Sequence, residues 1–250
     1  KEFLNNEFRL SSLSVLWPLN GLSYRNCPPR IKRGLDRAVM TAIVLLLESD
    51  VESVEAKNAT KSDIRRFIFD RLNTGGTALN AQELRNAIYP GEFNDLIIRL
   101  TRNPLFTSLW GIPPYEESDP SEYYENPRRQ GNSLYSSMGD CQIVLRFFAL
   151  RERQYIRGSM KRILDDCMGR HMGITRAEAD MLGDQFVERL TFANDLFGGH
   201  PFELPPDSKG KVKMSIALYD AVMMAVDRLW DQRDALLTRS DIARSRLLNL

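Results

Sequence analysis

Cysteine and histidine are scarce in this chain of 250 residues. Cys27, Cys141 and Cys167 are far apart and show no CxxC spacing, which argues against a disulfide framework or a zinc site and favours a reducing, cytoplasmic setting. His171 and His200 are the only histidines. They are too few and too separated in sequence for a histidine-centred metal centre, so we expect them at the surface or at helix ends and predict no metal site.

The chain also lacks a charge excess and a long apolar run. Its net charge is +1, so any attraction for nucleic acid must come from a local basic patch. The longest apolar run, residues 42–47 with Val39 and Met40 before it, is far shorter than the roughly 20 residues that cross a bilayer. With 43% hydrophobic and 27% charged residues, the composition is that of a soluble globular protein without a membrane segment.

The patterns along the chain predict a mainly α protein in three regions. Residues 1–103 contain one β-branched stretch, 40–47, that favours a buried strand. Residues 104–138 are rich in Pro, Tyr, Ser and Glu, which is typical of a long surface loop or linker. From residue 139 to 250 apolar residues recur at helical spacing, and this predicts a helical bundle.

Residues 62–86 form the most informative stretch, because two amphipathic helices meet there at a double-glycine turn. Arg71 falls on the inward face of the first helix, where a guanidinium requires a polar or acidic partner. Gly75 and Gly76 permit positive φ, and their successive amides could hold an anion. Asn80 has the spacing of an N-cap with Glu83 at the third helical position, so a second helix should begin at Ala81.

Two interpretations of this corner remain open from spacing alone. The periodicity places Ala81, Leu84, Ala87 and Ile88 on the apolar side of the second helix and leaves a polar stripe of Gln82, Arg85, Asn86 and Tyr89. The first interpretation is a helix-turn-helix corner whose polar stripe is solvated. The second is a polar pocket lined by Arg71, Asn73, Arg85 and Asn86.

The order of these features resembles the N-terminal-domain family of GmrSD-type restriction endonucleases, which carry an Asp-Gly-Gln-Gln-Arg motif on a ParB/sulfiredoxin-like fold. The matching pieces are residues 67–76, Leu79, residues 83–89, Gly91 and residues 93–94, supported by residues 3–5, 145–150 and 218–221. The resemblance implies a helical bundle with a small α/β, ParB/sulfiredoxin-like remnant near the N-terminus. The motif itself does not occur in this sequence. Residues 3–5 look like its continuation, so we expect that an N-terminal part is missing. Gln142 stands where the family has a Glu.

The resemblance also implies a function, namely nucleotide hydrolysis coupled to cleavage or nicking of foreign DNA, often modified phage DNA. The implied cofactors are a nucleoside triphosphate and a divalent metal. Phosphoryl transfer depends on positioning and charge neutralisation, so the inward Arg71, with Asn73, would act as catalytic support. The expected nucleotide-binding residues are Gly75, Gly76, Asn80, Arg85 and Asn86, with Glu83 as structural support.

Other functions remain open. The chain could be a non-catalytic DNA- or protein-interaction module, with Lys61, Arg65 and Arg66 as its DNA-binding residues. A second basic segment contains Arg30, Lys32, Arg33 and Arg37. A third hypothesis is a nucleotide-gated DNA clamp like other ParB relatives, which would need a homo-oligomer that closes on nucleotide.

Overall fold

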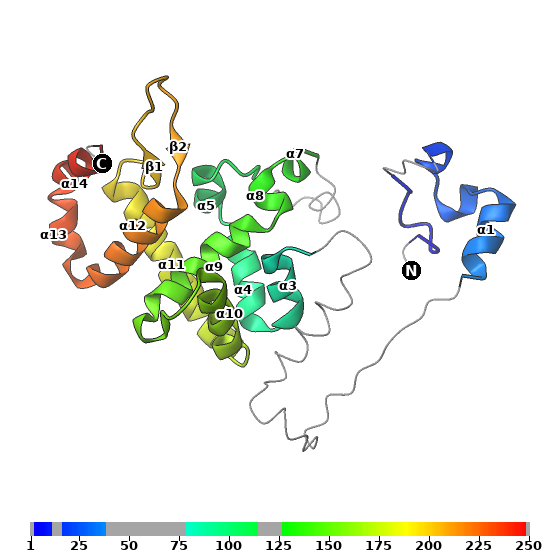
Figure 1. The fold of residues 1–250 in the computed structure, drawn as a ribbon, viewed down its shortest axis with the longest axis horizontal. Coiled ribbons are helices and arrows are strands. Elements are labelled where there is room, and N and C mark those ends of the chain that lie inside the picture. The colour runs from blue at the N-terminus through cyan, green and yellow to red at the C-terminus, as the bar shows by residue number, and fades with distance from the viewer. Residues whose placement is uncertain (1–2, 12–16, 39–78, 115–126, 249–250) are drawn as a thin grey trace, which may run out of the picture. The chain divides into compact units, whose positions relative to one another are not determined.

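The computed structural model describes residues 3–11, 17–38, 79–114 and 127–248, which belong to two compact units, Lys1–Glu52 and Ser53–Leu250 (Figure 1). Of the described residues, helices account for 65% and strands for 2%, which confirms the mainly α class. The described part of residues 1–103 contains no strand, so the ParB-like remnant stays a prediction. The strand expected at 40–47 lies outside the described residues. The domain boundary expected at residue 103 stays a prediction.

The first unit is small, and its described residues contain one α-helix. Its elements are η1 (Trp17–Leu19), η2 (Tyr24–Asn26) and α1 (Pro29–Asp36). Helix α1 begins with Pro29 at its first position, where a proline loses no hydrogen bond. No residue of α1 is buried, and Arg30, Arg33 and Arg37 are all exposed.

The described residues of the second unit form a helical bundle with one short hairpin. Its elements are α3 (Ala81–Ile88), α4 (Glu92–Leu100), α5 (Pro104–Leu109), α7 (Pro127–Gln130), α8 (Ser133–Ser136), α9 (Gly139–Arg151), η3 (Arg153–Tyr155), α10 (Met160–His171), α11 (Arg176–Leu196), β1 (Glu203–Leu204), β2 (Lys213–Met214), α12 (Ile216–Arg228), η4 (Trp230–Gln232), α13 (Arg233–Leu237) and α14 (Ser240–Leu248). Strands β1 and β2 are antiparallel, with Glu203 opposite Met214. None of the helices in the described ranges has the length and apolarity needed to cross a membrane.

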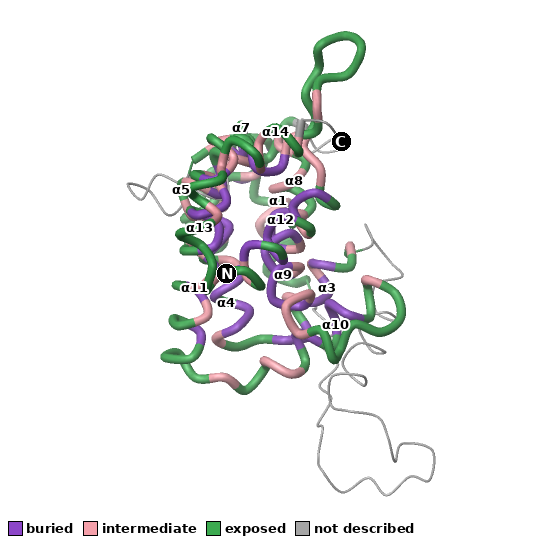
Figure 2. Tube along the Cα trace, turned by 90° about the vertical axis from the view of Figure 1, so that its left-hand side faces the viewer, coloured by how far each residue is buried: buried purple, intermediate pink, exposed green. Residues whose placement is uncertain are grey.

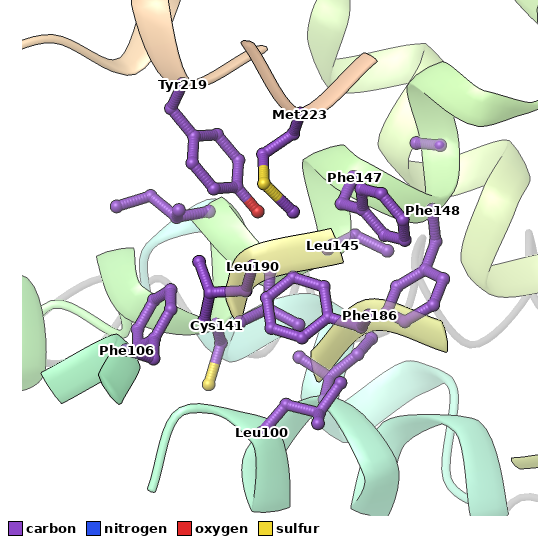
Figure 3. Packing of buried hydrophobic residues seen from close by; sticks show 14 of the residues in the cluster. Leu100, Phe106, Cys141, Leu145, Phe147, Phe148, Phe186, Leu190, Tyr219 and Met223 are labelled. Atoms are coloured by element: carbon purple, nitrogen blue, oxygen red, sulfur yellow. The ribbon is translucent and has the colours of Figure 1, made fainter. Parts of the chain in front are cut away.

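Helix α9 lies at the centre of this bundle and is apolar nearly all round, as a helix surrounded by neighbours should be. It contacts α3, α4, α8, α10 and α12. In Figure 2 much of α9 is purple, the colour of buried residues. Figure 3 shows Phe147 and Phe148 of α9 packed with Phe186 of α11, and the ring centroids of Phe147 and Phe186 are 5.3 Å apart in an edge-to-face arrangement.

Ion pairs tie α9 to the C-terminal helices at the rim of this core. Arg146 donates from Nε to Oδ1 of Asp220 at 2.9 Å, and its Nη2 bonds the other carboxylate oxygen. One turn further, Arg151 of α9 and Arg189 of α11 both pair with Asp227 of α12. The arginine that interrupts the apolar pattern of α9 therefore has a carboxylate partner, and the register between α9 and α12 is fixed by charge as well as packing.

The segment 104–138, predicted as a surface loop, contains helices α5, α7 and α8 in its described part. Asn103 and Asn132 cap α5 and α8 by accepting hydrogen bonds from backbone amides, and Phe106 of α5 is fully buried. The loop prediction is therefore wrong for these helices. Pro104 at the first position of α5 was a helix-start signal that the composition of the segment concealed.

Gly91 is the N-cap of α4 and has a backbone that side chains rarely adopt, with φ +133°. A Cβ at this position would lie 3.1 Å from the carbonyl oxygen of Met172, at the end of α10. We expect Gly91→Ala to lower the free energy of unfolding by about 1–3 kcal/mol, the usual cost of such strain.

Urea denaturation measures the effect of Gly91→Ala. Gly173→Ala is the matched control, because a Cβ at Gly173 meets nothing within 4 Å. Equal stabilities of the two variants would contradict the argument.

Candidate functional site

Helix α3 begins as its sequence predicts. The Asn80 side chain accepts hydrogen bonds from the amides of Gln82 at 2.8 Å and Glu83 at 3.0 Å, and the Asn80 amide donates to Oε2 of Glu83 at 2.6 Å. This is the expected capping box, so Glu83 supports the helix start. Asn80 also donates through Nδ2 to the carbonyl of Ser137 at 2.9 Å, which connects α3 to the segment between α8 and α9.

Arg85 is buried, with 3% of its surface exposed. Its Nε lies 2.8 Å from Oδ1 of Asp165 in α10, and Nη1 donates to Oε1 of Gln82 at 3.0 Å. A third donor, Nη2, lies 3.4 Å from the carbonyl of Lys161. These contacts are with α10 and α3 itself, so they fix the position of α3 in the bundle.

The first interpretation of α3, in which its polar stripe is solvated, is wrong. Gln82, Arg85 and Tyr89 are buried, whereas Ala81 and Ala87, predicted to face inward, are exposed. Leu84 and Ile88 are buried as expected. The apolar pattern predicted the wrong inward face for α3. Burying two small alanine side chains stabilises little, whereas Arg85 can be buried because Asp165 of another helix pairs with it.

Asn86 faces the other side of α3, toward the junction of α8 and α9. Its Nδ2 lies 3.1 Å from the sulfur of Met138, and its Oδ1 accepts from Nε2 of Gln82 at 3.0 Å. Met138 precedes α9 and has a left-handed backbone, φ 52° and ψ 27°. Such a conformation is costly for a residue other than glycine, and it occurs often at functional sites.

A cavity of about 350 Å³ opens at this junction. It is lined mostly by apolar surface. The lining residues lie in or next to α3, α4, α7, α8 and α9: Asn86, Ile98, Thr101, Arg102, Gln130, Tyr135, Ser136, Met138, Asp140 and Cys141. This size and lining are typical of pockets for small molecules. We call it the α9 cavity.

Asp140 is the acidic group of the α9 cavity, and 4% of its surface is exposed. Its carboxylate lies in the first turn of α9 and accepts a hydrogen bond from the amide of Cys141 at 2.8 Å. Burial raises the pKa of Asp140 to about 6, although hydrogen bonds from Cys141 act in the opposite direction. Near neutral pH this carboxyl group can therefore exchange a proton or accept hydrogen bonds in a mostly apolar environment.

Cys141 and Arg102 also affect the electrostatics of the α9 cavity. Burial raises the pKa of the Cys141 thiol far above its ordinary value, and the charge of Asp140 adds to this effect. The Asn86 side chain and the positive charge of Arg102 oppose the rise. Arg102 is thus close enough to influence the interior of the cavity. The mostly apolar lining of the cavity thus includes the carboxyl group of Asp140, the amide of Asn86 and the guanidinium of Arg102.

The structure brings only part of the predicted site together. Asn86 lines the α9 cavity, Asn80 and Glu83 form the helix cap beside it, and Arg85 turns away to Asp165. The other predicted residues lie outside the described ranges: Lys61, Arg65, Arg66, Arg71, Asn73, Gly75 and Gly76. Asp140 and Arg102 were missed, because their role follows from burial and from contacts between helices.

The two histidines differ from each other. His200 is exposed and its Nδ1 lies 3.1 Å from Oε1 of Glu203, as a surface residue should. His171 ends α10, as predicted, but it is not isolated from other ligand-type side chains. Glu152, Cys167 and His171 each offer a ligand atom within 4.8 Å of the other two. His171 thus has two ligand-type side chains close to it, while the absence of a metal site stays a prediction. The Cys167–His171 spacing on one helix face was the available signal.

In comparisons with known proteins, the chain matches no protein-family model, no curated protein and no solved structure. The resemblance to GmrSD-type endonucleases therefore stays a prediction from the residues that carry it.

Proposed function

We propose that this chain is a component of a nucleotide-hydrolysing antiphage restriction system, in which the α9 cavity forms one wall of the nucleotide pocket. The observation that carries the proposal is the position of Asn86. The helix that follows the double-glycine corner brings this residue to the wall of a cavity that also contains Asp140 and Arg102. The bundle would serve as the part that senses DNA or a partner.

The chemistry of the cavity supports a nucleotide as its ligand. Its apolar lining suits the faces of a base, and the Asn86 amide and Asp140 carboxyl can exchange hydrogen bonds with the edge of a base. The guanidinium of Arg102 suits a phosphate. In this proposal the described residues bind and orient the nucleotide. The hydrolytic groups would come from the double-glycine corner and from an Asp-Gly-Gln-Gln-Arg loop of the kind the resembled family carries.

Titration with a fluorescent ATP or GTP analogue tests the proposal on the full chain. We expect Asn86→Ala and Asp140→Asn each to weaken binding about tenfold, the effect of losing one hydrogen bond of about 1.4 kcal/mol. Asn194→Ala and Asp195→Asn, at the end of α11 and outside the lining of the cavity, are the matched controls. Melting curves establish that each variant is folded.

A measurement of DNA binding, together with the nucleotide titration, distinguishes the alternative, a non-catalytic DNA-interaction module. The exposed residues Arg30 and Arg33 of α1 and Arg37 at its C-cap favour this second function. DNA binding that weakens with salt and with loss of Lys61, Arg65 and Arg66, together with no nucleotide binding by the wild type, would support it. Nucleotide binding that is unchanged in both cavity variants would overturn the proposed pocket.

A further inference from the structure

A second cluster of polar side chains joins the end of α9 to the end of α10, in a region that the α9 cavity does not include. Glu152 is the C-cap of α9, and Cys167 and His171 are four residues apart on one face of α10. One ligand atom of each lies within 4.8 Å of the ligand atoms of the other two. We propose that Glu152, Cys167 and His171 bind a zinc ion that clamps α9 to α10.

The donor set and its spacing fit zinc. Thiolate, imidazole and carboxylate are the three ligand types that Zn²⁺ takes from proteins, and tetrahedral coordination separates its ligand atoms by roughly 3.3–3.8 Å. The Nε2 atom of His171 and Oε1 of Glu152 are 3.6 Å apart. The sulfur of Cys167 lies 3.7 Å from Nδ1 of the same ring, so the thiol is also next to the imidazole, although Nδ1 is not the nitrogen that would bind the metal.

Each oxygen of Glu152 has a different neighbour. Arg170 donates from Nε to Oε2 at 3.0 Å, and its Nη2 bonds the same oxygen. The guanidinium also stacks over Tyr155, 3.9 Å from the ring centroid. Because Arg170 takes Oε2, Oε1 is directed to the imidazole and can serve as the ligand atom. Arg170 thus orients the carboxylate and does not compete for that oxygen.

The imidazole of His171 is held in the orientation that a metal ligand needs. Its Nδ1 lies 3.0 Å from the carbonyl oxygen of Cys167, a contact that places the ring proton on Nδ1 and leaves Nε2 with a lone pair. Phe93 of α4 stacks on the ring with centroids 4.4 Å apart. A hydrogen bond from the second nitrogen to a carbonyl is the usual support of a zinc-bound histidine.

The remaining ligand is a buried thiol. Cys167 has no exposed surface, and in the absence of metal its sulfur is part of an uncharged thiol in the core. Zinc binding replaces the thiol proton, which passes to solvent. A Zn²⁺ ion then balances the thiolate and the Glu152 carboxylate. The side chains of Glu152 and His171 remain 25% and 17% exposed, which gives the ion a route from solvent and leaves a fourth position for water.

Cobalt titration of the full chain tests the proposal, because a cysteine-bound Co²⁺ ion shows a thiolate charge-transfer band in the near ultraviolet. We expect one equivalent of Co²⁺ to produce the band, Zn²⁺ to displace it, and Zn²⁺ to raise the melting temperature. Cys167→Ser and His171→Ala should abolish the band. Cys141→Ser, an equally buried thiol, and His200→Ala, a histidine beside a glutamate, should retain it.

Glu152→Gln keeps the test decisive if a buried variant fails to fold. This half-buried residue can change without opening the core, and the loss of its charge should weaken Co²⁺ binding at least about tenfold. Absence of the band in folded wild-type protein would overturn the proposal. So would a band that survives Cys167→Ser and disappears in Cys141→Ser or Cys27→Ser. Because these readouts involve no nucleotide, the result is independent of the proposed function.

Discussion

Replacing Asp165 with alanine should lower the free energy of unfolding by about 3–5 kcal/mol, the cost of leaving a buried charge without its partner. Asp165 holds the Nε of Arg85 at 2.8 Å, and the two side chains are 10% and 3% exposed. Of the hydrogen bonds described for the guanidinium, the variant would keep those to the Gln82 side chain and the Lys161 carbonyl, and neither group carries a compensating charge.

Urea denaturation with two companion variants makes this measurement specific. Asp166→Ala is the matched control. It removes the next carboxylate along α10, whose exposed pair with Arg162 spans 3.7 Å, and should cost less than about 1 kcal/mol. The double variant Arg85→Met with Asp165→Leu should recover most of the loss, because paired apolar side chains of similar volume replace a buried ion pair well. Equal effects of Asp165→Ala and Asp166→Ala would contradict a buried, charge-paired Arg85.

The Arg85–Asp165 pair also bears on the α9 cavity. Successive residues of a helix point about 100° apart, so a fixed Arg85 fixes the direction of Asn86 as well. Asn86 is thereby held against Met138 and the cavity wall. Arg85 was expected to bind nucleotide. Its described contacts instead indicate that it positions Asn86, the residue next to it.

Local signals predicted helix starts well. The predicted capping box of Asn80 and Glu83 is present, and Thr175 with Glu178 forms a second one at the start of α11 that follows the same sequence rule. Such signals depend on nearest neighbours in sequence, so one sequence is enough to recognise them. The same rule would have identified α5 from Asn103 and Pro104, had the polar composition of the segment not been given more weight.

Long-range contacts were beyond the sequence patterns. Arg85 meets Asp165 across 80 positions, and Arg146 meets Asp220 across 74. From periodicity alone, an arginine on a buried helix face is an unexplained exception. Its burial is explained only once the carboxylate partner in another helix is known. Both Arg146 and Asp220 lie in pieces that carried the family resemblance, but nothing in either piece indicated that they pair. The raised pKa of Asp140 likewise depends on α3, α4 and α8, which cover the start of α9.

Asp140 gives a second large effect, and this one changes with pH. Its pKa in the folded chain, about 6, is above the ordinary value of 3.8, so the folded state holds the proton more tightly than the unfolded state. The contribution of Asp140 to stability is therefore lost as pH rises from below 4 through 6, and this loss levels off above that range. One pKa unit corresponds to about 1.4 kcal/mol, which sets an upper limit of about 3 kcal/mol.

Asp140→Asn should consequently stabilise the chain at pH 8 by about 1–3 kcal/mol and have little effect at pH 4, because an uncharged amide avoids the cost of burying the carboxylate while its oxygen still accepts from the Cys141 amide. Urea denaturation at the two pH values measures the difference, with the exposed Asp195→Asn as control. A variant less stable than wild type at pH 8 would show that the charged carboxylate is needed by the fold. Stabilisation at pH 8 together with weakened nucleotide binding would instead mean that the chain retains a costly charge for its pocket, as functional sites commonly do.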